Sequence, residues 1–213
     1  DSYHSLSIEG YRVTDGLIER VRTGQWDPQE MKKDSESRNA LAARGYYQAF
    51  QTVRSNVREI LQAKETAGAV VAEHLQDWHF ELFEPCVQAA IIQASDLVGY
   101  RKNQVYISGS KHTPLHSDAV VDAMQTFYAL LKQEENSLVR AVLGHFFFVY
   151  IHPYMDGNGR TARFIMNAML ITGGYSWTII PVEKRDEYMS ALEKASVDGD
   201  IVPFAKFIYG LIR

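Results

Sequence analysis

The pattern of hydrophobic and polar positions is most distinctive in the second half of the chain. Leu138–Ile151 is apolar on nearly all sides of a helix, which predicts a buried helix. A polar turn follows, and then Arg160–Thr172 combines helix formers with apolar residues and ends at Gly173 and Gly174. Glycine commonly ends helices because it adopts left-handed backbone angles without strain. The sequence therefore predicts two buried helices joined by a polar turn.

Helical spacing of apolar residues, together with capping residues, predicts further helices along the chain. They are expected at Ser2–Glu9, from Thr14 or Asp15 to Arg22, and at Ala40–Gln62, Ala69–Phe83, Ser117–Lys132 and Val202–Leu211, with others starting at Pro85 and near Lys184. Ser117 is the expected N-cap of its helix. Residues 32–39 are polar and carry the densest charge, so we expect a loop or linker there.

Residues 99–116 interrupt the helical pattern. They contain the β-branched and aromatic run Val105-Tyr106-Ile107, followed by a glycine-containing turn and then by Pro114. This combination predicts a short β-hairpin. The expected fold class is therefore mainly α with one small β-hairpin, whose exposed part we expect at Lys111, His112 and Thr113.

Composition limits the class of protein. With 213 residues, of which 46% are hydrophobic, the chain can bury a sizeable core as one domain. The net charge of −4 argues against a nucleic-acid partner, which usually needs a basic face. Cys86 is the only cysteine, so no intrachain disulfide can form, and we expect a cytoplasmic location.

No contact with a membrane is expected either. The longest strongly apolar run, Val142–Ile151, is about half of the roughly 20 residues that a spanning helix needs. The chain begins at Asp1 rather than at methionine, so a targeting segment or a further domain could precede it. The sequence leaves the oligomeric state open, a homo-oligomer included.

The polar turn between the two buried helices contains several groups of the kinds that bind polyphosphate. Gly157-Asn158-Gly159 lies at a helix N-terminus, where unpaired N–H groups and the positive end of the macrodipole attract anions. Arg160 and Arg163 are three residues apart, so they project from one helical face and can hold different phosphate oxygens.

Two further side chains of this turn supply acid–base and metal chemistry. Asp156 directly precedes the glycine turn, and a carboxylate beside phosphates is the usual protein ligand of Mg²⁺. His152 alone in the run has an unperturbed pKa near neutrality, which suits a general base. Asp-Gly-Asn-Gly is also a common turn without any chemistry. A charge cluster between two buried helices, however, needs partners, and bound phosphate and metal would provide them.

The turn resembles the signature of Fic domains, HxFx(D/E)GNGRxxR. The fixed positions are matched by His152, Asp156, Gly157, Asn158, Gly159, Arg160 and Arg163. Tyr154 stands where the family usually has phenylalanine, which keeps the ring and adds a hydroxyl. The resemblance extends from about Tyr46 to the end of the chain. It implies a Fic-type helical bundle that binds ATP, transfers AMP to a Ser, Thr or Tyr hydroxyl of a protein, and releases pyrophosphate.

The resemblance also implies roles for the residues that match. His152 would be the base, Asp156 would bind Mg²⁺, and the glycine turn with Arg160 would hold the phosphates. Arg163 would bind the γ-phosphate. The hairpin would be the flap that covers the nucleotide and pairs with the target, a form of β-augmentation, and Lys111, His112 and Thr113 would belong to it.

A second motif concerns regulation. Ser5, Glu9 and Gly10 fit (S/T)xxxE(G/N), which marks an inhibitory helix in some Fic proteins. Ser5 and Glu9 are four residues apart and share one helical face. Glu9 could pair with Arg163 and occupy the guanidinium that should bind the γ-phosphate. We therefore expect one Fic-type domain over 1–213, with an inhibitory segment at 1–14, a helical arm or linker at 15–45 and the core at 46–213.

Alternatives to self-inhibited AMP transfer remain open at this point. Proteins of this fold also remove AMP or transfer other phosphate-containing groups, and a non-catalytic nucleotide-sensing module would use the same phosphate site. The expected partners are ATP and a hydroxyl-bearing protein target, the chain itself included. Outside the motif, His145 is expected to be a hydrogen-bonded core residue, and His74 and His79 are expected on helix faces and in packing.

Overall fold

The computed structural model of the protein describes residues 1–24, 34–63 and 66–212, which are mainly helical, as expected. The helices are α1 (Ser2–Ile8), α2 (Asp15–Arg22), α3 (Asp34–Ala63), α4 (Ala67–Gln88), α5 (Val120–Gln133), α6 (Ser137–Ile151), α7 (Asn158–Thr172), α8 (Arg185–Glu193) and α9 (Val202–Tyr209). Short helical turns lie at η1 (Ala94–Leu97), η2 (Ser117–Ala119), η3 (Val182–Lys184) and η4 (Lys194–Asp198). Among these elements, none is both long and apolar enough to cross a bilayer.

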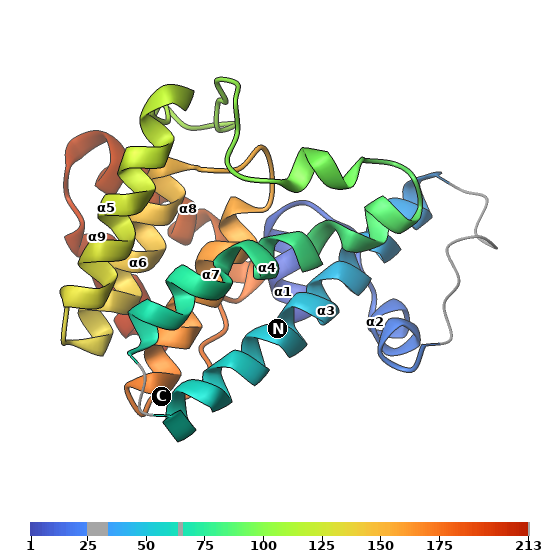
Figure 1. The fold of residues 1–213 in the computed structure, drawn as a ribbon, viewed down its shortest axis with the longest axis horizontal. Helices are drawn as coiled ribbons and strands as arrows, with labels where there is room; N and C mark the ends of the chain where they lie inside the picture. Colours follow the sequence, from blue (N-terminus) through green and yellow to red (C-terminus); the bar gives the residue numbers. More distant parts are fainter. Residues whose placement is uncertain (25–33, 64–65, 213) are drawn as a thin grey trace.

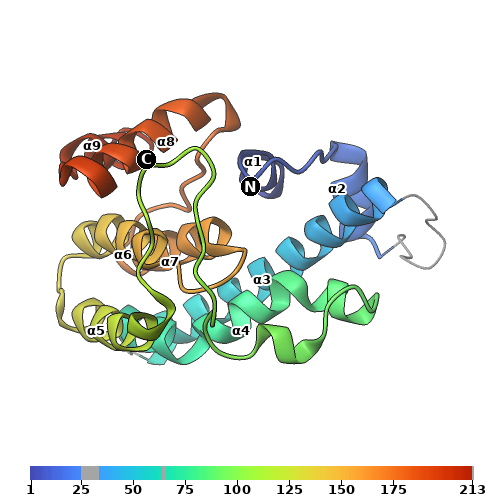
Figure 2. The same ribbon diagram turned by 90° about the horizontal axis from the view of Figure 1, so that it is seen from above.

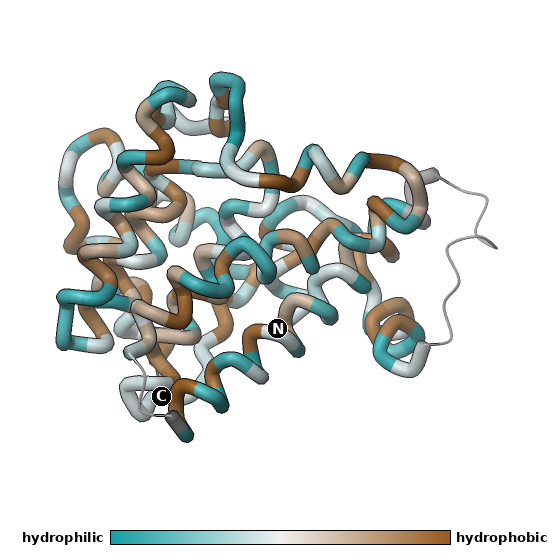
Figure 3. Tube along the Cα trace, viewed as in Figure 1, coloured by the Kyte–Doolittle hydropathy of each residue, from teal (hydrophilic) through white to brown (hydrophobic). Residues whose placement is uncertain are grey.

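Helix α7 lies at the centre of the bundle. It contacts α3, α4 and α6, and its residues are buried along most of its length. The long helices α3 and α4 run side by side, with hydrophobic and hydrophilic positions alternating along both (Figure 1, Figure 3). Helix α1 packs against α3 and η3, on the side of the bundle where α8 lies (Figure 2). The N-terminal segment and the N-terminus of α7 therefore meet at one face of the molecule.

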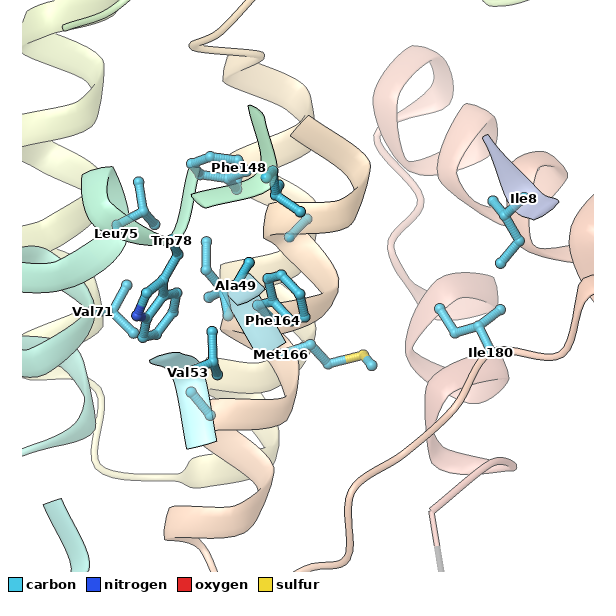
Figure 4. Close-up of a cluster of buried hydrophobic side chains, with 14 of the residues drawn as sticks. Ile8, Ala49, Val53, Val71, Leu75, Trp78, Phe148, Phe164, Met166 and Ile180 are labelled. Carbon is cyan, nitrogen blue, oxygen red and sulfur yellow. The ribbon is translucent and has the colours of Figure 1, made fainter. Parts of the chain in front are cut away.

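The core between α3, α4 and α7 is built around Trp78, which has no exposed surface. Its ring lies near Val53, Val71 and Phe164, as Figure 4 shows. The indole Nε1 donates to Asn56 Oδ1 at 2.9 Å, so its polar atom stays paired inside the core. This packing holds α7 in a fixed place relative to α4.

The N-terminal helices lie close to where they were expected. Helix α1 covers Ser2–Ile8, and α2 begins at Asp15 with Thr14 as its N-cap. The Thr14 hydroxyl accepts a hydrogen bond from the Leu17 N–H at 3.2 Å. The expected loop at 32–39 is wrong from Asp34 onward, where α3 already starts, and residues 32 and 33 lie outside the described part. Extending an existing helix costs little because each added residue gains one hydrogen bond.

Two other expected boundaries are wrong. Helix α4 continues through Pro85 to Gln88 instead of ending at Phe83. Proline removes one hydrogen bond but has a helical φ, and its own carbonyl still accepts from the Ala89 N–H at 3.0 Å. The helical turn η2, which leads into α5, starts at Ser117 and has His116 as its N-cap, because His116 Nδ1 accepts from the Asp118 N–H.

The expected β-hairpin is also wrong, because the described residues contain no strand. Residues 101–116 instead form a loop with two extended legs, which we call the rim loop (Figure 2). The N–H groups of Lys111 and His112 donate to side chains, those of Glu193 and Ser110, and Pro114 has no N–H to donate. The returning leg thus has few backbone donors left for a ladder.

Candidate active site

His152 follows the last residue of α6 and has a left-handed backbone, with φ 54° and ψ 60°. Its Nδ1 lies 3.1 Å from the Val149 carbonyl oxygen. Since a carbonyl only accepts hydrogen bonds, Nδ1 carries the proton and Nε2 remains an acceptor. Burial lowers the pKa of His152, the hydrogen bond to Val149 opposes this shift, and the charge of Arg101 adds to it. The imidazole is therefore neutral at neutral pH, and its Nε2 has a lone pair that can accept a proton.

The turn after His152 is closed by Asn158. Its Oδ1 accepts from the Tyr154 N–H at 3.0 Å, and its Nδ2 donates to the Tyr154 carbonyl at 2.8 Å. Gly157 has a φ of 84°, and a side chain there would also meet the ring of Phe83. The backbone of the turn is thus fixed by its own residues and by α4.

His79 on α4 supports the same turn. Its ring stacks on Tyr154 with centroids 3.6 Å apart, and its Nε2 donates to the Asp156 carbonyl at 3.0 Å. Burial lowers the pKa of His79 to about 4, so the ring is neutral. From the sequence, His79 was expected only on a helix face and in packing. Its position as a polar residue within an apolar helix was the one sign in the sequence of a further role.

Helix α7 presents its N-terminus to the carboxylate of Glu9. The helix starts at Asn158, and Gly159 lies in its first turn. A Cβ atom on Gly159 would collide with Glu9 Oε1, so the absence of a side chain makes room for this carboxylate. An anionic group therefore already lies at the helix N-terminus that was expected to bind anions.

Arg160 is buried to 1% exposure and lies between two aromatic rings. Its guanidinium carbon is 5.3 Å from the centre of the Tyr11 ring and 5.0 Å from that of Phe83. Its Nη2 lies 3.3 Å from Asp156 Oδ1. The rings hold the flat group by cation–π contacts and leave its edge to bind oxygen atoms.

Arg163 is bound by the N-terminal helix. Its Nε donates to the Ser5 hydroxyl at 2.9 Å, and its Nη2 donates to the Ser5 carbonyl at 3.0 Å and to Glu9 Oε1 at 2.8 Å. Gly10 follows with a φ of 84°, which turns the chain away after α1. Ser5 and Glu9, which were expected on one face, thus contact the same guanidinium.

Three of the residues described above, Glu9, His152 and Gly159, line one polar cleft of about 920 Å³. Its wall includes Glu9, Gly10, His152 and Gly159, the rim loop from Tyr106 to His112, and residues of α8 such as Tyr188 and Met189. Glu193 anchors the rim loop: Oε2 accepts from the Ser110 hydroxyl at 2.5 Å, and Oε1 from the Lys111 N–H at 2.7 Å.

The three residues expected at the tip of this loop differ in exposure. Lys111 and Thr113 are exposed. His112 is half-buried, because its ring stacks on Tyr150 and its Nε2 lies 2.9 Å from the Tyr150 carbonyl. His145, by contrast, is fully buried behind the cleft and its Nε2 pairs with the Tyr188 hydroxyl at 2.8 Å.

Asp156 is the side chain of the motif that suits a metal ion. Its carboxylate is 61% exposed. Within the described ranges, no three His, Cys, Asp or Glu side chains gather to form a complete metal site. A single exposed carboxylate beside a phosphate site fits Mg²⁺, which takes its remaining ligands from phosphate oxygens and water.

The chain is similar in sequence to known Fic proteins. The model of the Fic/DOC family matches residues 69–170. A protein named "Protein adenylyltransferase Fic" from Drosophila yakuba is 32% identical over 180 residues, which are 72% of this chain and 36% of the relative. The protein of the same name from Drosophila virilis is 42% identical over 113 residues, 51% of this chain and 23% of the relative. The chain thus spans only about a third or less of these relatives.

Solved structures share the fold. Fic-1 from C. elegans superposes with a TM-score of 0.77 at 22% identity, covering 99% of this chain and 58% of that one. A Fic domain containing signaling protein from Bacteroides thetaiotaomicron VPI-5482 gives a TM-score of 0.74 at 19% identity, covering 99% and 80%. At these identities the likeness concerns the fold alone.

Proposed function

The chain belongs to the Fic/DOC family, and we propose that it transfers AMP from ATP to a hydroxyl of a protein target and releases pyrophosphate. One observation carries the proposal: His152, with Nε2 as an acceptor, lines the same cleft as Gly159 at the N-terminus of α7. A base and an anion-binding helix end therefore face the same space. The proposed substrate is ATP because the site offers two guanidiniums in addition to the helix end.

We assign the phosphates of ATP to the positive end of α7. The amides of Gly157, Asn158 and Gly159 and the edge of Arg160 would bind the phosphate oxygens. Arg163, three residues further along the helix, would bind the γ-phosphate. When bound at Asp156, Mg²⁺ would neutralise phosphate charge. These interactions would stabilise the charge that develops as pyrophosphate leaves.

The chemical step follows from this placement. The target hydroxyl gives its proton to Nε2 of His152, and its oxygen attacks the α-phosphorus. The bond between the α-phosphorus and the bridging oxygen breaks, and the electron pair leaves with pyrophosphate. A positioned base of this kind typically contributes about 10²- to 10⁴-fold to the rate.

We further propose that the N-terminal segment inhibits this reaction. Glu9 forms an ion pair with the Arg163 guanidinium and fills the space beside Gly159. The γ-phosphate of ATP therefore cannot reach Arg163 or the backbone of Gly159. In this organisation residues 1–14 are the inhibitory segment, 15–45 an arm and 46–213 the core. Helix α3 crosses the boundary at residue 45 without a break.

The rim loop is the proposed site of contact with the protein target. Lys111 and Thr113 are exposed beside the cleft and would meet the target chain directly. His112 would act from below the surface by holding the loop on α6 through Tyr150. The extended leg before Ser108 would offer its backbone to the target.

Labelled ATP tests the proposal. ATP carrying the label at the α- or the γ-phosphorus is incubated with Mg²⁺ and either the parent chain, Glu9→Gly, or Glu9→Gly with His152→Ala, and label on the chain itself is measured. Protein labelled from the α-position only, in Glu9→Gly and not in the double variant, is the expected result. Label from the γ-position would mean phosphate transfer. Binding of ATP with no labelled protein at all would favour a nucleotide-sensing module.

Removal of AMP from modified proteins is a second candidate. The observation that favours it is that the Glu9 carboxylate lines the same cleft as His152, where it could position a water molecule for attack on the phosphorus. An AMP-modified protein is the substrate for this test. Release of AMP by the parent chain, with loss of release in Glu9→Gly, would support the second candidate.

A further inference from the structure

Arg101 is a buried arginine whose described contacts are all with backbone carbonyls. Its exposure is 5%, and no carboxylate among the described residues lies within ion-pair distance of it. The guanidinium donates from Nε to the His152 carbonyl at 2.7 Å and from Nη1 to the Asn103 carbonyl at 2.9 Å. Its Nη2 donates to the carbonyls of Leu115 and, at 3.5 Å, of Ile151.

Part of this arrangement is ordinary capping of a helix. The last carbonyls of a helix lack intrahelical partners and carry partial negative charge, so a cation near them is favourable. Ile151 and His152 lie at the end of α6 and account for two of the four contacts. The other two contacts go to the rim loop, which capping does not require.

The contacts at the end of α6 fix the backbone of the proposed base. The backbone N–H of Arg101 donates to the Pro153 carbonyl at 2.9 Å, so Arg101 binds the carbonyls of three successive residues, Ile151, His152 and Pro153. His152 has a left-handed backbone, which is unfavourable for a residue with a Cβ. Arg101 therefore stabilises the conformation that directs the imidazole into the cleft.

The remaining contacts join the two legs of the rim loop. Asn103 lies on the outgoing leg and Leu115 on the returning leg, and one planar guanidinium binds both. Among the described residues, the one backbone hydrogen bond between the two sides of the loop runs from the Ser110 N–H to the Ile107 carbonyl at 3.1 Å and closes the turn at the tip. A second side chain also joins the two legs: Gln104 Nε2 donates a hydrogen bond to the Pro114 carbonyl at 2.9 Å.

We propose that Arg101 is a positioning residue that joins His152 and the rim loop into one rigid unit. The inference rests on the proposed function, in which the target lies on the rim loop and gives its proton to His152. If the two parts moved independently, the distance from the target hydroxyl to Nε2 would vary, and proton transfer requires that distance to be short. Arg101 touches neither nucleotide nor target in this arrangement.

The test uses Arg101→Lys, because lysine keeps the charge but cannot bind both legs and the helix end with one planar group. Arg140→Lys is the matched control. Arg140 also donates to two loop carbonyls, those of Glu134 and Glu135 at 2.6 and 3.3 Å, but it lies near the start of α6 and does not line the cleft. All variants carry Glu9→Gly so that ATP can enter.

Two measurements are made on each protein. Single-turnover transfer of AMP should be at least tenfold slower in Arg101→Lys, while the Kd for ATP stays within threefold. Hydrogen exchange should become at least tenfold faster for the amides of 102–116 and of His152 together, with no change at Val53 in the core. Arg140→Lys should match its parent in both measurements.

The exchange measurement decides the inference independently of the proposed function. If the Glu9→Gly parent transfers no AMP, the proposed function fails, but coupled exchange of His152 and the rim loop would still support the role of Arg101. Faster exchange in only one of the two parts would overturn it, as would unchanged exchange. An Arg101→Lys protein that does not fold would also overturn it, because Arg101 would then serve general stability.

Discussion

Arg163 and Glu9 are 154 residues apart in the sequence, yet Arg163 Nη2 donates to Glu9 Oε1 at 2.8 Å. The arginine side chain is 5% exposed and the glutamate side chain 28% exposed, so solvent screens the pair only in part. The same guanidinium also binds Ser5 through two further hydrogen bonds. The N-terminal helix is thus held on the central helix through one arginine of the proposed phosphate site.

Glu9→Gly should increase the affinity for ATP. The substitution frees Arg163 and the space beside Gly159, and a hydrogen bond to a charged group is worth about 1.5–3 kcal/mol, or about tenfold or more in Kd. Calorimetric titration with ATP and Mg²⁺ measures the change. Glu183→Gly is the control, since that side chain is 69% exposed and contacts His4 only at 3.9 Å. Equal affinities of Glu9→Gly and its parent would contradict the inhibitory role.

His152→Ala should abolish transfer while leaving nucleotide binding intact. A general base accounts for about 10²- to 10⁴-fold in rate, and His152 does not contribute to the proposed phosphate contacts. The single-turnover rate and the Kd for ATP, both in the Glu9→Gly background, separate the two effects. His116→Ala serves as control because His116 is 69% exposed. A variant at position 152 that keeps its rate would show that another group takes the proton.

Chelation of divalent metal should stop transfer, and Asp156→Asn should raise the Mg²⁺ concentration needed for half-maximal rate by about tenfold or more. The physical reason is that an amide oxygen carries no charge and is a weaker ligand for a hard cation. Rates measured over a Mg²⁺ series give this concentration. Asp118→Asn, at a side chain 89% exposed, should behave as its parent does. An identical Mg²⁺ dependence in both variants would count against Asp156 as the ligand.

The free energy of unfolding should fall as the pH decreases below about 6.5. Burial lowers the pKa of His79 to about 4 and that of His145 to about 3, from a usual value of 6.5. The unfolded chain therefore binds more protons in this range, so the contribution is complete above pH 6.5 and is lost towards pH 4. Each additional proton bound by the unfolded chain changes the slope of the free energy of unfolding against pH by about 1.4 kcal/mol per pH unit.

Urea unfolding between pH 4.5 and 7 checks this dependence. His145→Gln removes one of these protons and should make the slope smaller, whereas His116→Gln, at an exposed position, should leave it unchanged. Parallel curves for the parent and His145→Gln would mean that His145 is not held neutral by its surroundings.

The motif and its helices were predictable because their determinants are local. An apolar run predicts α6, and the glycines around Asn158 predict where α7 begins, as found. The errors occur where the determinants are not local. Whether residues 101–116 pair as strands depends on Glu193, which lies about eighty residues away and takes the N–H of Lys111.

The residues that support the site were not predictable for the same reason. His79 appears in the sequence as one polar position in an apolar helix, and its bond to the Asp156 carbonyl spans 77 residues. Arg101 has no motif around it, since its partners are backbone carbonyls that any residue provides. Side chains that bind the backbone of distant segments leave no pattern of residue types.

The intact mass of the Glu9→Gly protein after incubation with ATP and Mg²⁺ tests the central claim most directly, because self-modification can be measured without a second protein. We predict a gain equal to one or more AMP groups, at least tenfold faster than in the parent chain and absent when His152 is replaced by alanine. A gain equal to phosphate, or AMP added at the same rate with and without Glu9, would contradict the account of a self-inhibited adenylyltransferase.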